Sequence, residues 1–222
     1  MDTANLIQSI ALYALPVLFA ITLHEAAHGY AAKHFGDNTA WTMGRVTLNP
    51  IKHIDPMGTI LMPLILYFAT SGAFLFGYAK PVPVRFGNLR NPKRDMIWVA
   101  LAGPGANFVQ ALMWGALFHV FNGVGVTEPF LVEMCQAGLK VNLVMFALNL
   151  FPIPPLDGGR ILVGLLPFRQ AEMLARVEPW GFFIVMGLIV THVLDWLWMY
   201  PVIALTGSLV EVLLLPLYWI AH

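Results

Sequence analysis

The run His24-Glu25-Ala26-Ala27-His28 places two imidazoles four residues apart. On a helix, residues at this spacing project from the same face, so both side chains can bind one metal ion. Glu25 stands beside that face and can take a proton from a metal-bound water. A solvated polar helix face is the alternative, but this run ends an apolar stretch, where three ionisable groups are costly unless they serve a function. The run therefore predicts a metal site with His24 and His28 as ligands and Glu25 as the general base.

The composition predicts that these residues sit in a membrane protein. Of the 222 residues, 59% are hydrophobic and only 11% are charged, against roughly 45–50% and 25% in soluble domains. The 12 basic and 12 acidic residues cancel, so no basic field is present for nucleic acid to bind, and we expect no nucleic-acid partner. The lone cysteine, Cys135, excludes an internal disulfide framework and a cysteine-rich metal site.

A membrane-spanning helix needs about 20 largely apolar residues, and uncharged stretches mark six such segments. We expect an all-α polytopic membrane protein with one domain over residues 1–222, comprising a catalytic core over 5–165 and a C-terminal helical hairpin over 178–221. Basic residues flank the second segment on both sides, and it contains proline and glycine, which favours a re-entrant entry over a clean crossing. The six segments are Thr3–His24, Pro56–Ala79, Met96–Thr127, Val141–Leu156, Pro179–Leu194 and Trp196–Val210, with Asp195 and Pro201 marking a turn between the last two.

Lysine and arginine follow the first, second and fourth segments, whereas the loop after the third carries only Glu128 and Glu133 before Lys140. By the positive-inside rule, the amino terminus is external and the basic loops are cytoplasmic. Asp157 then ends a segment that runs inward, as the first segment does, so it reaches the same depth as the two histidines. Catalytic zinc usually has three protein ligands and a water. A turn aspartate before Gly158-Gly159 is the alternative, but the depth match favours Asp157 as the third ligand.

Several motifs in this order resemble the site-2 protease family of intramembrane zinc metalloproteases, over roughly residues 20–165. The likeness is strongest to the compact bacterial members that lack PDZ and CBS domains. It implies one Zn²⁺ per chain held by His24, His28 and Asp157, with Glu25 as general base, in a bacterial inner membrane with the site opening toward the cytoplasm. The motifs are HEAAHGY, GRVTLNP, HIDPMGT, AKPVPV, LAGPGANF and NLFPIPPLDGGR.

Three further polar residues are candidates for the substrate or the oxyanion. Asn149 lies two turns before Asp157 on the same apolar segment; a helix–helix hydrogen bond is the alternative, and the resemblance favours a role at the substrate. Asn107, beside a small-residue patch at Gly103–Ala106, is a candidate oxyanion donor. His53 lies in a polar stretch and is a candidate lining residue of the zinc cavity, although most loop histidines are merely solvated.

The segment Lys80–Val84 reads Lys-Pro-Val-Pro-Val, which excludes a helix and predicts a short extended element near the site. An extended peptide could pair with its free edge, or the segment could be a rigid connector.

Together these features predict hydrolysis of a peptide bond in or near a transmembrane segment. The partners would be the lipid bilayer and a single-span membrane protein or its pre-cleaved remnant. The alternatives are a membrane metal transporter, in which intramembrane His and Asp would mark an ion path, and a non-catalytic zinc-binding membrane protein.

Overall fold

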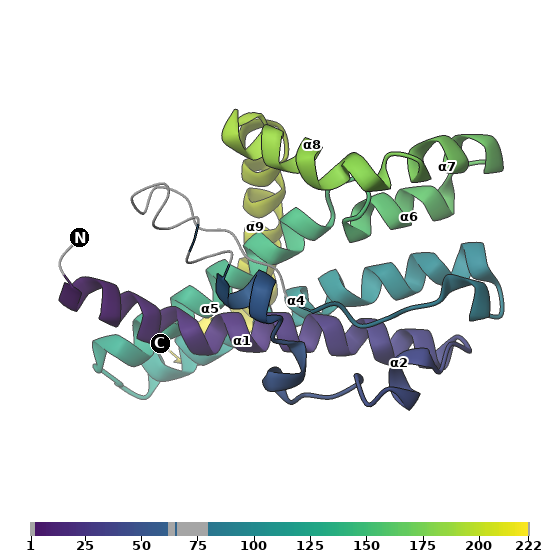
Figure 1. The fold of residues 1–222 in the computed structure, drawn as a ribbon. Coiled ribbons are helices and arrows are strands. Elements are labelled where there is room, and N and C mark those ends of the chain that lie inside the picture. Colours follow the sequence, from purple (N-terminus) through teal and green to yellow (C-terminus); the bar gives the residue numbers. More distant parts are fainter. Residues whose placement is uncertain (1–2, 62–64, 66–79, 222) are drawn as a thin grey trace.

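The computed structural model describes residues 3–61, 65 and 80–221, and in this part of the chain every regular element is a helix (Figure 1). The all-α class expected from the sequence is confirmed. The four long helices are α1 (Thr3–His34), α4 (Pro92–Gly123), α5 (Pro129–Asn149) and α9 (Tyr200–Ala221). The shorter elements are α2 (Thr39–Thr42), η1 (Pro50–His53), η2 (Pro56–Leu61), η3 (Phe86–Asn88), α6 (Asp157–Leu165), α7 (Phe168–Ala175), α8 (Glu178–Val190) and η4 (Asp195–Met199).

Four helical stretches are long and apolar enough to cross a membrane, which fits a polytopic membrane protein. The bent pair α7–α8, with 66° between its helices, would be a fifth if it crosses as one broken span. The re-entrant entry expected for the second segment falls mostly on residues 62–64 and 66–79, which lie outside the described residues. The four stretches are Ile10–His34, Pro92–Gly123, Pro129–Asn149 and Asp195–Trp219.

The structure places one helix break and corrects one expected turn. The fourth apolar segment is broken at its proline run, as Pro152, Pro154 and Pro155 predict: α5 ends at Asn149, three residues before Pro152. The turn near the carboxyl terminus does not lie between Asp195 and Pro201. It lies at Thr191-His192, where His192 has a φ of 57°, and Pro201 is in the first turn of α9, where the missing N–H has no helical acceptor to lose.

Helix α4 is the centre of the bundle and packs against α1, α5, α6 and α9. Small residues make these contacts close, which is how helices associate where lipid removes the hydrophobic driving force. Gly138 of α5 shows how close the approach is, since a Cβ there would lie 2.3 Å from the Trp114 ring of α4. Alanines are fully or almost fully buried along the same contacts: Ala20, Ala26, Ala32, Ala100, Ala111 and Ala147.

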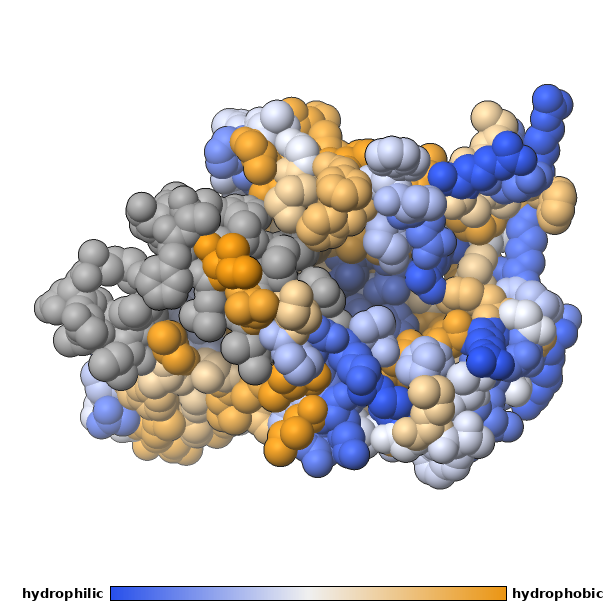
Figure 2. Space-filling view, viewed as in Figure 1, coloured by the Kyte–Doolittle hydropathy of each residue, from blue (hydrophilic) through white to orange (hydrophobic). Residues whose placement is uncertain are grey.

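The surface divides into an apolar part and a polar part. Apolar side chains gather over the amino-terminal half of α1, and charged side chains gather at the opposite end, where α2, α6 and α7 lie (Figures 1 and 2). The 32 residues of α1 are about 48 Å long at 1.5 Å per residue, which exceeds a hydrocarbon core of about 30 Å. The last turns of α1, with the histidine pair, therefore reach toward the polar end.

Residues 80–85 run beside α1 without helical structure. The short extended element expected from the sequence is thereby confirmed. It enters the cavity described below through Val82 and Val84.

Candidate metal centre

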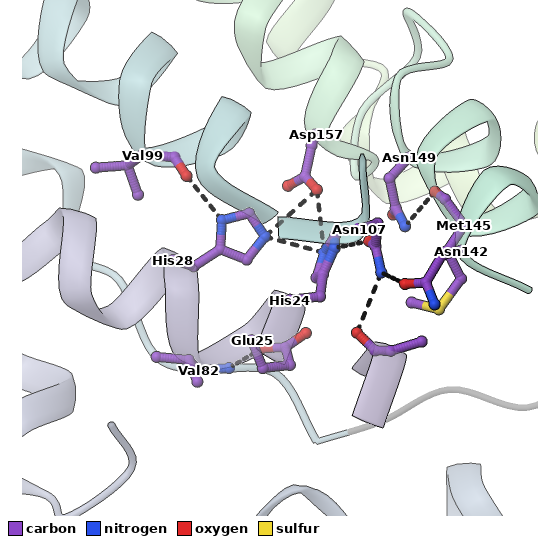
Figure 3. Close-up of polar contacts among 11 residues, drawn as sticks. His24, Glu25, His28, Val82, Val99, Asn107, Asn142, Met145, Asn149 and Asp157 are labelled. Carbon is purple, nitrogen blue, oxygen red and sulfur yellow. Dashed lines mark hydrogen bonds and ion pairs between the residues drawn. The ribbon is translucent and has the colours of Figure 1, made fainter. Parts of the chain in front are cut away.

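His24 and His28 lie one turn apart on α1 and present their imidazoles to the same point (Figure 3). Their ring centroids are 4.6 Å apart with planes at 86°, and the two Nε2 atoms are 3.0 Å apart. Helical spacing alone brings the rings together. Their approach also requires space on the facing helix, which Gly103 of α4 provides: a Cβ at that position would lie 2.3 Å from His28 Nε2 and 2.6 Å from His24 Cε1.

Asp157, the first residue of α6, completes the group. Its Oδ2 lies 3.3 Å from the Nε2 atom of each histidine. The three atoms form a nearly equilateral triangle, and a tetrahedral zinc ion with ligands at about 2.0–2.1 Å requires edges of roughly 3.3 Å. Asp157 is 9% exposed, and no described residue donates a hydrogen bond to the buried Oδ2. An orphaned carboxylate oxygen at this position fits a cation as its partner.

Hydrogen bonds on the outer side of each ring leave the inner nitrogens free to bind metal. His28 Nδ1 is 2.7 Å from the carbonyl oxygen of Val99. A carbonyl only accepts, so Nδ1 carries the proton and Nε2 keeps its lone pair. His24 Nδ1 donates in the same way to Asn107 Oδ1 at 2.7 Å. The donor set is therefore two neutral imidazoles and one carboxylate.

Asn107 acts behind His24 and does not face the cavity as an oxyanion donor. Its side chain is fully buried, and its Nδ2 donates to the Ala20 carbonyl at 3.2 Å and to Asn142 Oδ1 at 2.9 Å. With Oδ1 on His24, both amide hydrogens are engaged. Asn142, whose Nδ2 donates to Gly138 O at 2.9 Å, thus fixes the orientation of the Asn107 amide and, through it, the His24 ring. Sequence reasoning missed Asn142; an amide in the middle of an apolar helix was the available signal.

A cavity of about 190 Å³ opens beside the three ligand candidates, with room for several water molecules. Glu25 lines it, and its Oε2 accepts a hydrogen bond from Val82 N at 2.6 Å. A carboxylate beside a metal-ligating triangle, with access to water, has the placement required of a general base. The other lining residues include Pro81, Val82, Val84, Phe86, Val99, Ala100, Asn149, Pro155, Leu156 and Arg160.

The remaining two candidates have different positions. Asn149 lines the cavity from the end of α5, and its Nδ2 donates to Met145 O at 3.0 Å. It does not share a helix with Asp157, because residues 150–156 separate α5 from α6. His53 lies outside this cavity lining. Its Nε2 is 2.9 Å from Thr47 O, and its carbonyl accepts from Lys80 N at 2.9 Å, so it packs the loop that leads to the extended element.

Comparison with known proteins agrees with this chemistry. The Bacillus subtilis protein named "Putative zinc metalloprotease YwhC" is 36% identical over 182 residues, which cover 80% of this chain and 79% of that protein. "Putative zinc metalloprotease Rip2" of Mycolicibacterium smegmatis is 31% identical over 201 residues, covering 87% and 73%. Rip2 of Mycobacterium tuberculosis is 30% identical over 166 residues, covering 73% and 59%. Neither a protein-family model nor a solved structure matches the chain. The chain therefore belongs to the zinc metalloprotease family that includes YwhC and Rip2.

Proposed function

We propose that this chain is an intramembrane zinc metalloprotease of the site-2 type. Its substrate would be a single-span membrane protein, or the remnant left by an earlier cut, hydrolysed at a peptide bond in or near the transmembrane segment. The observation that carries the proposal is the convergence of three metal-binding lone pairs and one carboxylate on a cavity of about 190 Å³ between apolar helices. The family relationship supports the same chemistry.

The proposed roles follow from the contacts. His24, His28 and Asp157 would hold one Zn²⁺, which supplies Lewis acidity for a carbonyl and for water when bound. Glu25 would accept the proton of the attacking water and pass it to the leaving amine. Asn149 keeps one amide hydrogen beyond its bond to Met145 O, so it could donate to the substrate carbonyl from the cavity wall.

The arrangement favours a protease over a metal transporter. Transport requires successive exchange sites along a path. Among the described residues, only the group His24, His28 and Asp157 gathers three metal-binding side chains. Its histidines are also fixed from behind by Val99 and Asn107, which suits a permanently bound ion.

We infer that the cavity opens to the cytoplasm of a bacterial cell, because basic loops follow the first and fourth apolar segments. Cysteine labelling on a Cys135→Ser background tests this orientation. Arg169→Cys on α7 should react with an impermeant reagent only from inside, and Glu128→Cys only from outside. Both positions are exposed. The reverse pattern would contradict the orientation.

The activity is tested by comparing cells that carry the wild-type chain with cells that carry Glu25→Gln. The substituted chain should retain zinc but lose cleavage, because the ligands remain and only the base is removed. Membrane proteomics should then reveal single-span fragments that accumulate with Glu25→Gln. Glu133→Gln on α5, an exposed Glu-to-Gln change away from the cavity, is the matched control and should resemble the wild type. Identical fragment profiles for wild type and Glu25→Gln would refute the proposal.

A further inference from the structure

The extended segment 80–85 has an unusual set of backbone partners. No described strand lies beside it, and its backbone is held at several points, chiefly by side chains. Arg45 Nη2 donates to Lys80 O at 2.9 Å and to Pro81 O at 3.3 Å. At the far end, Arg85 N donates to the buried carboxylate of Asp37 at 2.7 Å. These ties hold both ends of the segment against α1 and the loop that follows it.

The middle of the segment has a single backbone donor. Pro81 and Pro83 have no N–H, so Val82 carries the one amide hydrogen between residues 80 and 84. That hydrogen is directed at Glu25 Oε2, 2.6 Å from Val82 N, a short charge-assisted hydrogen bond. In Figure 3 the second carboxylate oxygen of Glu25 points away from Val82. One oxygen is therefore held, and the other is left for chemistry in the cavity.

We infer that the Val82 backbone N–H is a positioning group for the Glu25 carboxylate. The extended segment thereby helps to orient the general base. This inference rests on the proposed function. A glutamate has three side-chain torsions, and a general base must stay within hydrogen-bond reach of the proton it takes. Glu25 has no other hydrogen-bond partner among the described residues. The Val82 N–H is thus what restricts its rotamers, in the way that a third group orients the base in other hydrolases.

The inference is tested by removing the hydrogen and keeping the backbone extended. Val82→Pro does this, and Val82→Ala is its comparison, because it trims the side chain but retains the N–H. We expect Val82→Pro to lower kcat roughly 10- to 100-fold below Val82→Ala, with KM and zinc content unchanged. If the wild-type chain cleaves its substrate and the two variants have equal kcat values, the inference is overturned and the proposed function stays intact.

Gly29→Ala provides a second route if Val82→Pro does not load zinc. A Cβ at Gly29 would lie 2.7 Å from Val46 Cγ2 and 3.2 Å from Val82 Cγ1, so both valines must move away from α1, and the Val82 N–H moves relative to Glu25. We expect a fall in kcat at unchanged KM and zinc content. An unchanged kcat in this variant would contradict the positioning role.

A double-mutant cycle of unfolding temperatures tests the hydrogen bond between Val82 N and Glu25 without an assay of proteolysis. The temperature of thermal unfolding is measured after zinc has been removed with a chelator. Val82→Pro and Val82→Ala are each measured with the native Glu25 and in combination with Glu25→Ala. With Glu25 present, Val82→Pro should unfold several degrees below Val82→Ala. With Glu25→Ala, that gap should close, because the N–H has lost its acceptor. An equal gap in both backgrounds would mean that the proline acts only on the backbone, and would overturn the inference even if the chain proved not to be a protease.

Discussion

The metal centre and the extended segment are held in place in opposite ways. In the metal centre, helices carry the side chains, and Val99 O and Asn107 fix the two imidazoles from behind. In segment 80–85, side chains from elsewhere hold a backbone that has no neighbouring strand among the described residues. The first design gives rigid ligands, and the second places a peptide edge beside the cavity. The difference teaches that the proposed metal ion and the proposed base, Glu25, depend on separate supports, so each can be disturbed without the other.

The largest expected effect comes from the ligands themselves. His28→Ala and Asp157→Ala should reduce zinc from about one ion per chain to nearly none, because two protein ligands rarely hold catalytic zinc. Asp157→Asn should do the same, since a neutral amide cannot offset the charge of the ion in a low-dielectric site. Metal analysis of the purified variants measures this. If Asp157→Asn kept full zinc and normal cleavage, Asp157 would be a turn residue and not a ligand.

The next effect tests how closely α4 approaches the ligands. Gly103→Ala places a methyl group on the histidine rings, 2.3 Å from His28 Nε2 before any relaxation. We expect this variant to lose most of its zinc while remaining in the membrane. Gly105→Ala is the matched control, because nothing lies within 4 Å of its added Cβ, and it should bind zinc as the wild type does. Similar zinc contents in the two variants would show that the histidines do not depend on this contact.

A smaller effect on zinc binding is expected from the residues that support the outer side of the His24 ring. Asn107→Ala removes the acceptor of the Nδ1 hydrogen bond and should weaken zinc binding about 10- to 100-fold, as loss of an outer partner does at other zinc sites. Asn142→Ala should weaken it less, because this residue acts only on the Asn107 amide. Competition with a chelator of known affinity gives both values. A stronger effect at Asn142 than at Asn107 would contradict this order of support.

The smallest expected effect comes from Asp37, which binds the far end of the extended segment. A change at Asp37 should leave the zinc content unchanged. Burial disfavours the charged form of Asp37, but hydrogen bonds from Thr39, Arg85 N and Asn88 outweigh it and lower the pKa of the carboxyl. A lowered pKa contributes stability above the unfolded-state value of about 3.9, which is lost as the pH falls through the folded-state pKa. Asp37→Asn should therefore destabilise the protein at pH 7 by about 1–3 kcal/mol and much less near pH 3. Thermal unfolding at the two pH values checks this, and an equal loss at both would contradict it.

The same comparison explains what could be predicted from the sequence. The histidine pair could be found because its geometry follows from four residues of one helix. Asp157 could be matched to it because the charge pattern predicts that both motifs stand at the ends of segments that run in the same direction. The outer supports could not be found, since Glu25 and Val82, Asp37 and Arg85, and Arg45 and Lys80 are 35 to 57 residues apart. A local sequence pattern does not reveal contacts between residues so far apart in the chain.

One expected role was wrong. Asn107 was expected at the oxyanion because the sequence shows an amide near the site but not which side of the helix it occupies. The break in the fourth segment, in contrast, could be predicted, because Pro152, Pro154 and Pro155 cannot continue a helix. Prolines end α5 and let Asp157 open a new helix.

The central claim is that zinc and Glu25 together perform proteolysis, and one reconstitution tests it directly. Purified chain in lipid vesicles is combined with a single-span substrate identified from the Glu25→Gln cells, then chelated, reloaded with zinc and assayed for cleavage. We predict that cleavage stops on chelation, returns with one zinc per chain, and is absent from Glu25→Gln carrying the same zinc. Cleavage by zinc-loaded Glu25→Gln, or by chelated wild-type chain, would contradict the account.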